Sequence, residues 1–184
     1  MFWRRMRLGA AMLVVLTASC ARFRTETDRP DKAPEGPSNG NIAAMLLAAN
    51  NTDISYAKLV PDHTTNSAVR DYAARMITDH AAVNTAVTEL IARTSIEPQE
   101  NTASLSYRDE STANRALLRR LVGRQFDSTY IANEIAFHTK LLRTLDTMMI
   151  PKAQDGQLRQ ILVLVRPAVS AHLDHAQRLQ ATLK

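Results

Sequence analysis

Few residues interrupt helix formation in most of this chain, and their spacing limits what it can fold into. From residue 41 onward, proline and glycine occur only at Pro61, Pro98, Gly123, Pro151, Gly156 and Pro167. Both residue types commonly end helices, so the stretches between them are candidates for long helices. Aromatic residues make up only 5% of the chain, which disfavours a sheet. We therefore expect an all-α fold.

Apolar residues recur between these breakers at alternating steps of four and three, which is the spacing of one helix face. A helix after an N-cap at Asn66 or Ser67 is predicted to bury Val69, Ala73, Met76, His80, Val83, Val87 and Leu90. A helix from about residue 127 to Pro151 is predicted to bury Ile131, Ile135, His138, Leu142, Leu145 and Met149. A helix after Asp155, bent at Pro167, is predicted to bury Leu158, Leu162, Val165, Val169, His172, Ala176, Leu179 and Leu183.

The other segments complete the expected architecture. A first helix should run from about residue 42 to residue 60. The polar stretch 97–107 predicts a loop, and the basic stretch 115–122 predicts one short helix. Residues 41–184 are therefore expected to form an antiparallel four-helix bundle with one extra short helix.

Each of the four long helices carries a polar residue close to its middle. These residues are Asp53, His80, His138 and His172, the last lying about three residues, or roughly 4 to 5 Å, past the middle of its helix. In an up-down-up-down bundle the helix midpoints lie at one level. We therefore expect the four side chains to converge on a central polar site, with His175 one helical turn away.

The N-terminal part of the chain has the order of a bacterial export signal. Residues 1–19 combine three arginines, a short apolar run and small residues before Cys20, which predicts a signal peptide. The segment 16–20 resembles a lipobox, in which the cysteine receives a diacylglycerol. The alternatives are an ordinary secretory signal with a stray cysteine, or an uncleaved membrane anchor.

The residues after Cys20 favour a tether to a membrane. Residues 20–40 contain three prolines and mixed charges with almost no large apolar side chain, so they are expected to be disordered. Ala21 stands where aspartate would favour retention at the inner membrane. By resemblance to Gram-negative lipoproteins, we expect an outer-membrane lipoprotein that faces the periplasm and contacts the membrane through its lipid.

The positive charge of the chain does not indicate nucleic-acid binding. Lysine and arginine number 23 against 18 acidic residues, a net charge of +5. Three of the arginines lie in residues 1–19, so the remaining balance is 20 against 18, or +2. No nucleic-acid partner is expected. The basic positions Arg115, Arg119, Arg120 and Arg124 are interpreted as a solvated face rather than a contact with anionic lipid.

Several segments match a known family in order and spacing. They are Asp53-Ile54 and Lys58-Leu59; Ala73, Met76, Asp79-His80 and Asn84; Phe126-Asp127, Tyr130 and His138; and Pro167, His172-Leu173, Ala176-Gln177 and Leu179. Over residues 41–183 the chain resembles the bacterial Domain of Unknown Function 4142 proteins. This resemblance implies a ferritin-like bundle that is exported or lipid-anchored, without an agreed activity, substrate or metal. The chain departs from the family at Asp53, where glutamate is usual, and at Phe137, where aspartate commonly precedes the histidine.

Two interpretations of the central residues remain open. Imidazole and carboxylate groups bind zinc, copper or iron, so Asp53, His80, His138 and His172 are candidate metal ligands. The same residues can instead form a buried hydrogen-bonded network. A ferritin-type di-iron centre is disfavoured, because neither His80 nor His172 has a glutamate three residues before it. The flanking candidates are Asp79, Tyr130, Glu134 and His175.

No sequence motif indicates an enzyme. The chain contains no glycine-rich phosphate loop, no nucleophile elbow and no cysteine-histidine pair, so no catalytic residue is assigned. We expect a non-enzymatic envelope lipoprotein that acts as an interaction or stress-related module. The alternative is a periplasmic protein that binds a transition metal through the central histidines and Asp53.

Overall fold

The computed structural model describes residues 36–183, and within this range every regular segment is a helix. The predicted signal peptide, Cys20 and the tether up to residue 35 lie outside the described residues. The described part belongs to one compact unit. None of its helices is both long enough and apolar enough to cross a bilayer. The predicted all-α bundle is confirmed.

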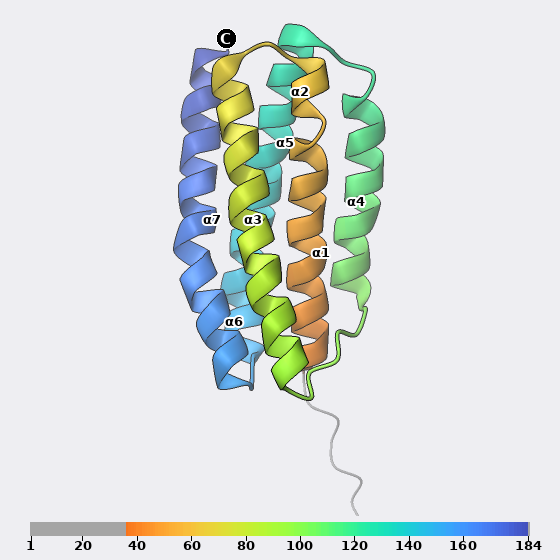
Figure 1. Ribbon diagram of the computed structural model, residues 1–184, viewed down its shortest axis with the longest axis vertical. Coiled ribbons are helices and arrows are strands. Elements are labelled where there is room, and N and C mark those ends of the chain that lie inside the picture. The colour runs from red at the N-terminus through yellow and green to blue at the C-terminus, as the bar shows by residue number, and fades with distance from the viewer. Residues whose placement is uncertain (1–35, 184) are drawn as a thin grey trace, which may run out of the picture. The chain divides into compact units, whose positions relative to one another are not determined.

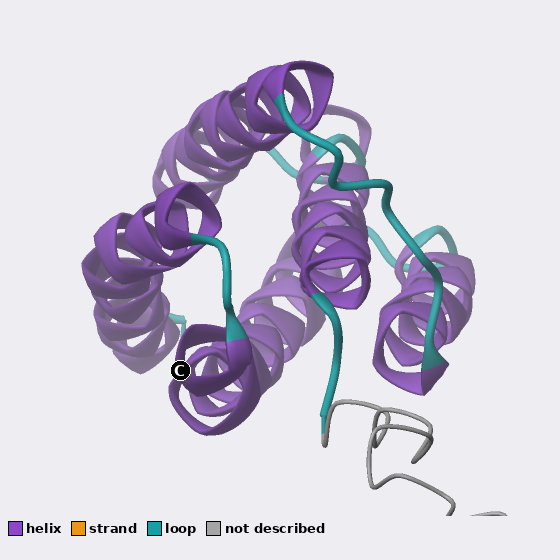
Figure 2. Cartoon of the chain, turned by 90° about the horizontal axis from the view of Figure 1, so that it is seen from below, coloured by secondary structure: helices purple, strands orange, loops and turns teal. Residues whose placement is uncertain are grey.

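Five long helices form the body of the bundle (Figure 1). They are α1 (Asn39–Ala57), α3 (Ser67–Arg93), α4 (Thr102–Leu118), α5 (Gly123–Thr144) and α7 (Gly156–Thr182). Three short segments connect them: α2 (Val60–His63), the π-helix η2 (Leu145–Met149) and α6 (Ile150–Lys152). Figure 2, which views the bundle from below, shows these helices joined by loops.

Four of the long helices enclose the core, and the fifth lies outside them. Helix α1 packs against α3, α3 against α7, α7 against α5, and α5 against α1, while α4 packs mainly on α1. Following the colours of Figure 1, α1, α4 and α7 run upward and α3 and α5 run downward. Helix α4 therefore carries the chain back along the bundle, so that α3 and α5 run in the same direction. This long crossover differs from the simple up-down-up-down order that we expected.

Helix α4 is also longer than the sequence predicted. The expected loop over 97–107 ends at Asn101, which caps α4 by accepting a hydrogen bond from the backbone N–H of Ser104 at 2.9 Å. Only Ser104, Tyr107 and Leu118 of this helix are buried. Residues 102–114 are mostly polar, and this composition is why the sequence analysis predicted a loop over the first part of α4.

Other helix ends follow local capping chemistry. Asn66 and Asp155 cap α3 and α7 as expected, each accepting from backbone N–H groups of the first turn. Helix α1 begins at Asn39, three residues before the expected start at about residue 42, with Ser38 as its cap. Helix α5 begins at Gly123 rather than near residue 127, because Gly123 adopts a φ of 55° and restarts the helix at once.

The buried face of α5 is rotated from the predicted one. Ile135 and Leu142 are only half-buried, while Glu134, Phe137 and Leu141 on the adjacent stripe are fully or nearly fully buried. The predicted faces of α3 and α7 agree better, since among the expected residues only Val83 and Leu183 are half-buried. Ile131, His138, Leu145 and Met149 are buried as predicted, so the buried surface of this segment is broader than the predicted stripe.

The apolar core consists of two separate clusters along the bundle axis. The lower core cluster, at the bottom of Figure 1, contains Ile42, Leu46, Leu90, Leu141, Leu158 and Leu162 among others. The upper core cluster contains Tyr56, Val69, Met76, Phe126, Ile131 and Leu179 among others. On α1, α3 and α7, the buried residues Asp53, His80 and His172 lie between the residues of these two clusters. On α5, His138 directly follows Phe137, the first residue of the lower core cluster on that helix. The core is therefore divided by a polar layer.

Candidate metal centre

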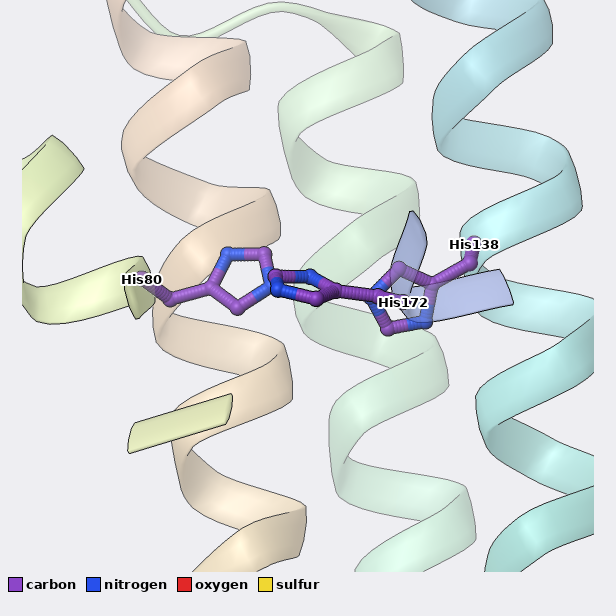
Figure 3. A group of neighbouring side chains, drawn as sticks. All are labelled: His80, His138 and His172. Atoms are coloured by element: carbon purple, nitrogen blue, oxygen red, sulfur yellow. The ribbon is translucent and has the colours of Figure 1, made fainter. Parts of the chain in front are cut away.

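The polar layer is built from one residue of each enclosing helix. Asp53 comes from α1, His80 from α3, His138 from α5 and His172 from α7. All four are buried, with exposed fractions of 3% or less. Figure 3 shows the three imidazole rings at one level, pointing toward one another from different helices. We call these four residues the His–Asp cluster.

The ligand-type atoms of this cluster lie close together. Asp53 Oδ2 is 2.8 Å from His80 Nε2 and 3.3 Å from His138 Nε2. The ring centroid of His172 lies 5.4 Å from that of His80 and 5.4 Å from that of His138. One nitrogen from each histidine lies within 4.8 Å of those of the other two. The three histidines thus meet at one point, and Asp53 contacts two of them, His80 and His138.

Groups outside the cluster determine which ring nitrogen carries the proton. His80 Nδ1 donates to Asn50 Oδ1 at 2.8 Å, and His138 Nδ1 donates to the backbone carbonyl of Glu134 at 2.9 Å. His172 Nε2 donates to Asp79 Oδ2 at 2.8 Å. Each outer partner is an oxygen that only accepts, so the opposite ring nitrogen of a neutral imidazole has a free lone pair. Those lone pairs belong to His80 Nε2, His138 Nε2 and His172 Nδ1.

The inward-facing atoms have no hydrogen-bond partner among the described residues. This holds for His80 Nε2, His138 Nε2, His172 Nδ1 and both carboxylate oxygens of Asp53. The short contacts between Asp53 and the two histidines do not have the geometry of hydrogen bonds. Buried polar atoms are rarely left in this state, because losing water without a replacement costs about 1–3 kcal/mol for each group. These five atoms therefore face one another without an aligned hydrogen bond between them.

The ionisation states suit cation binding. Burial would raise the pKa of Asp53, but the neighbouring His80, His138 and His172 outweigh it and hold the pKa below its usual value. Burial lowers the pKa of His138 to about 4 and also lowers that of His172. At neutral pH the cluster thus contains a carboxylate, and at least two of its imidazoles are uncharged, the forms in which these groups bind metals.

Glu134 lies beside the cluster, and its pKa is shifted in the opposite direction from that of Asp53. Burial, and secondly the negative charge of Asp53, raise its pKa well above the usual value, which favours the neutral form of Glu134. Its Oε2 accepts a hydrogen bond from the Tyr72 hydroxyl at 3.4 Å and lies 3.4 Å from His138 Nδ1. The site therefore offers two buried carboxyl groups, those of Asp53 and Glu134, fewer than the roughly four of a ferritin-type di-iron centre.

The other flanking candidates have separate positions. Asp79, predicted beside His80, instead bonds His172 and also contacts Arg75 Nε at 3.3 Å. Tyr130 is fully buried, with its ring stacked on Phe126 at 5.8 Å between centroids. His175 is not part of the cluster, since its ring packs edge-on against Tyr72 at 5.2 Å.

Two further residues shape the site: Asn50, which sequence reasoning missed, and Phe137, which it noted only as a departure from the family pattern. Asn50 holds His80 and donates in turn to Asn84 Oδ1 at 2.9 Å. Phe137 packs edge-on against His138, with centroids 5.2 Å apart, and forms an apolar wall. Asn50 was detectable as a polar residue that ends an apolar run three positions before Asp53, on the same helix face.

The dimensions of the His–Asp cluster fit a small four-coordinate ion. Zinc bonds of about 2.0–2.1 Å place neighbouring tetrahedral ligand atoms ~3.3 Å apart. The two Asp53 contacts, 2.8 and 3.3 Å, are close to this spacing. The nitrogens, within 4.8 Å of one another, need to approach by about an ångström or a little more at most.

Comparison with known proteins places the chain in a family. The domain of unknown function DUF4142 matches residues 25–179, which is most of the chain. No curated protein and no solved structure matches it. The match includes all four helices that enclose the core and all four residues of the His–Asp cluster. The chain therefore belongs to the DUF4142 family.

Proposed function

We propose that this protein binds one divalent transition-metal ion through Asp53, His80, His138 and His172. The observation that carries the proposal is the set of outer hydrogen bonds. Each histidine donates its outer N–H to an oxygen and turns its lone pair toward the carboxylate of Asp53. Histidines that bind metals in proteins are held in this way by a carbonyl or carboxylate.

The donor set favours zinc, with copper and then iron as the other candidates. Three imidazole nitrogens and one carboxylate oxygen are common zinc ligands, and closed four-ligand sites are typical of structural zinc. The cluster is nearly inaccessible to solvent, which suits a resident ion better than an ion that must meet a substrate. The proposed role is therefore binding rather than catalysis.

The test is metal binding to protein purified without a polyhistidine tag. After chelation, zinc, copper and iron(II) are titrated by calorimetry, and bound metal is measured by mass spectrometry. We expect one ion per chain, with a stabilisation of about 2.7 kcal/mol at a hundredfold excess over the Kd. The double variant His80→Leu and His172→Leu should abolish both effects.

A matched control lies on the same helix. His175→Leu removes a histidine one turn from His172 but outside the cluster, so it should bind metal like the parent. A parent protein that binds no metal, and whose unfolding is unchanged by metal, would contradict the proposal and support the hydrogen-bonded network. Equal loss in the His175 variant would show that binding occurs elsewhere.

We further propose that the domain is held in the bacterial envelope by a lipid on Cys20, facing the periplasm. The support is the order of charged, apolar and small residues before this cysteine. Cys20→Ser should release the protein from the membrane fraction or leave the signal peptide uncleaved. Unchanged processing and fractionation of this variant would rule out the lipid anchor.

A further inference from the structure

A hollow of about 250 Å³ lies between α1 and α4, on the side of α1 that faces away from α7. The two helices run side by side in Figure 1. Four residues of each helix line the hollow: Ala48, Asn51, Thr52 and Ser55 of α1, and Arg108, Ser111, Thr112 and Arg115 of α4. None of these eight residues is acidic.

The same spacing on both helices forms the hollow. Each set of four follows the pattern i, i+3, i+4, i+7, which places its members on one face. The short side chains let the helices approach, so that Ser55 Oγ lies 3.0 Å from Ser111 Oγ and Thr52 Oγ1 donates to the backbone carbonyl of Tyr107 at 3.0 Å. The two arginines flank this floor, separated by about 10.5 Å along α4.

The hollow contains more hydrogen-bond donors than acceptors. Arg115 Nε is buried and has no hydrogen-bond partner among the described residues. Arg108 pairs through one terminal nitrogen with Glu100, which leaves other N–H groups of its guanidinium for a ligand. The hydroxyls of Ser55 and Thr112 can accept as well, but they already donate to backbone carbonyls.

We propose that this hollow binds a phosphate group. A guanidinium presents N–H groups in a planar fork that matches phosphate oxygens, and its charge strengthens those hydrogen bonds. The guanidinium of Arg115, whose Nε has no acceptor among the described residues, would donate to phosphate oxygens through the N–H groups that reach the hollow. The phosphate can belong to the free anion or to a lipid headgroup. This site is independent of the proposed metal centre.

The test is calorimetric titration of the full-length protein in non-ionic detergent with inorganic phosphate. Arg115→Gln should weaken binding by about tenfold or more, as expected for loss of a charged hydrogen-bonding group. Arg119→Gln is the matched control, because this exposed residue lies one turn further along α4 and outside the hollow. It removes the same charge and should leave the affinity within about twofold.

A second variant acts in the opposite direction. Glu100→Gln removes the acidic partner of Arg108 and should tighten phosphate binding by a few-fold, an effect that a purely structural role would not produce. Equal weakening by Arg115→Gln and Arg119→Gln would overturn the proposal, since it would indicate general charge attraction.

Vesicles distinguish the two sources of phosphate. Stronger binding of the parent than of Arg115→Gln to vesicles with phosphatidic acid, but not to vesicles of phosphatidylcholine alone, would support the site and assign a lipid headgroup to it. Binding to inorganic phosphate with no such vesicle difference would support the site and assign the free anion. A parent that binds neither inorganic phosphate nor phosphatidic acid at the hollow would overturn the proposal.

Discussion

The polar layer and the two apolar core clusters lie on the same four helices but are stabilised in different ways. In the lower and upper core clusters, Leu162 and Met76 are buried among side chains that need only fit in shape. In the polar layer, His80 and Asp53 are equally buried, but each atom needs a partner of a particular kind. The apolar side chains find all the contacts they need within the chain. The inward-facing atoms of the polar layer find no hydrogen-bond partner among the described residues.

This difference predicts different responses to mutation and to solution conditions. Apolar packing is insensitive to pH and to metal ions, since no protonation or coordination state changes. The polar layer should respond to both, because its side chains titrate and, under the proposed function, bind a cation. Perturbing each region in turn therefore tests whether they are as distinct as the structure indicates.

The largest effect is expected from a cavity in the lower core cluster. Leu162→Ala removes a fully buried side chain of α7 and should lower the free energy of unfolding by about 2–5 kcal/mol. The loss should be the same at pH 7 and pH 5 and with or without zinc, as measured by urea denaturation.

Leu164→Ala is the matched control, because the same substitution falls on a side chain of α7 that is 67% exposed. It should change stability by no more than about 0.5 kcal/mol. A loss in Leu162→Ala that varies with metal or pH would mean that the lower core cluster and the polar layer are coupled.

The second effect is acid destabilisation of the polar layer. Burial lowers the pKa of His138 to about 4 from an ordinary value of 6.5, so between these pH values only the unfolded chain takes up the proton. Stability is therefore fully present above pH 6.5 and falls as the pH drops toward 4, by on the order of 3 kcal/mol. His172, whose pKa burial also lowers, acts in the same direction.

Glu134 opposes this slope. Its raised pKa means that above about pH 4.5 only the unfolded chain releases the proton, so its contribution to stability falls as the pH rises. Glu134→Gln keeps the shape of the protonated side chain and removes the titration. In chelator, this variant should lose stability more steeply than the parent between pH 6.5 and 4.5. Identical slopes in the two proteins would contradict the assignment of a protonated Glu134.

The apolar layers were largely predictable from the sequence, and the reasons are local. The alternating spacing around Met76 and Leu162 identified the buried faces of α3 and α7, because a long helix with one contact surface imposes that period. Helix α4 was underestimated, since residues 102–114 are mostly polar and only Ser104, Tyr107 and Leu118 of this helix are buried. Its role as a crossover follows from packing on α1, which the sequence does not encode locally.

The polar layer was only partly predictable. Counting residues gave the positions of Asp53 and His80 along their helices, and these positions were enough to predict that the two side chains meet. The prediction held although the up-and-down order of the helices differs from the expected one. The outer partners could not be derived in this way. Asp79 lies next to His80 in sequence but bonds His172 across the bundle, because adjacent helix residues point in different directions.

The smallest effect separates the outer partners from the metal ligands. Hydrogen bonding to His172 holds the pKa of Asp79 below its usual value even though burial would raise it, so a carboxylate accepts from His172 Nε2. Asp79→Asn keeps the size of the side chain but weakens this contact, and should lower metal affinity by about 10–100-fold while leaving one ion per chain.

Asp71→Asn is the matched control, because Asp71 is exposed on the same helix and its substitution should leave the metal affinity unchanged. The zinc affinities of the two variants are compared by calorimetric titration at the same ionic strength. Equal affinities in both variants would show that the outer hydrogen bond does not orient His172 toward the cluster, and would weaken the case that the polar layer is built for a cation.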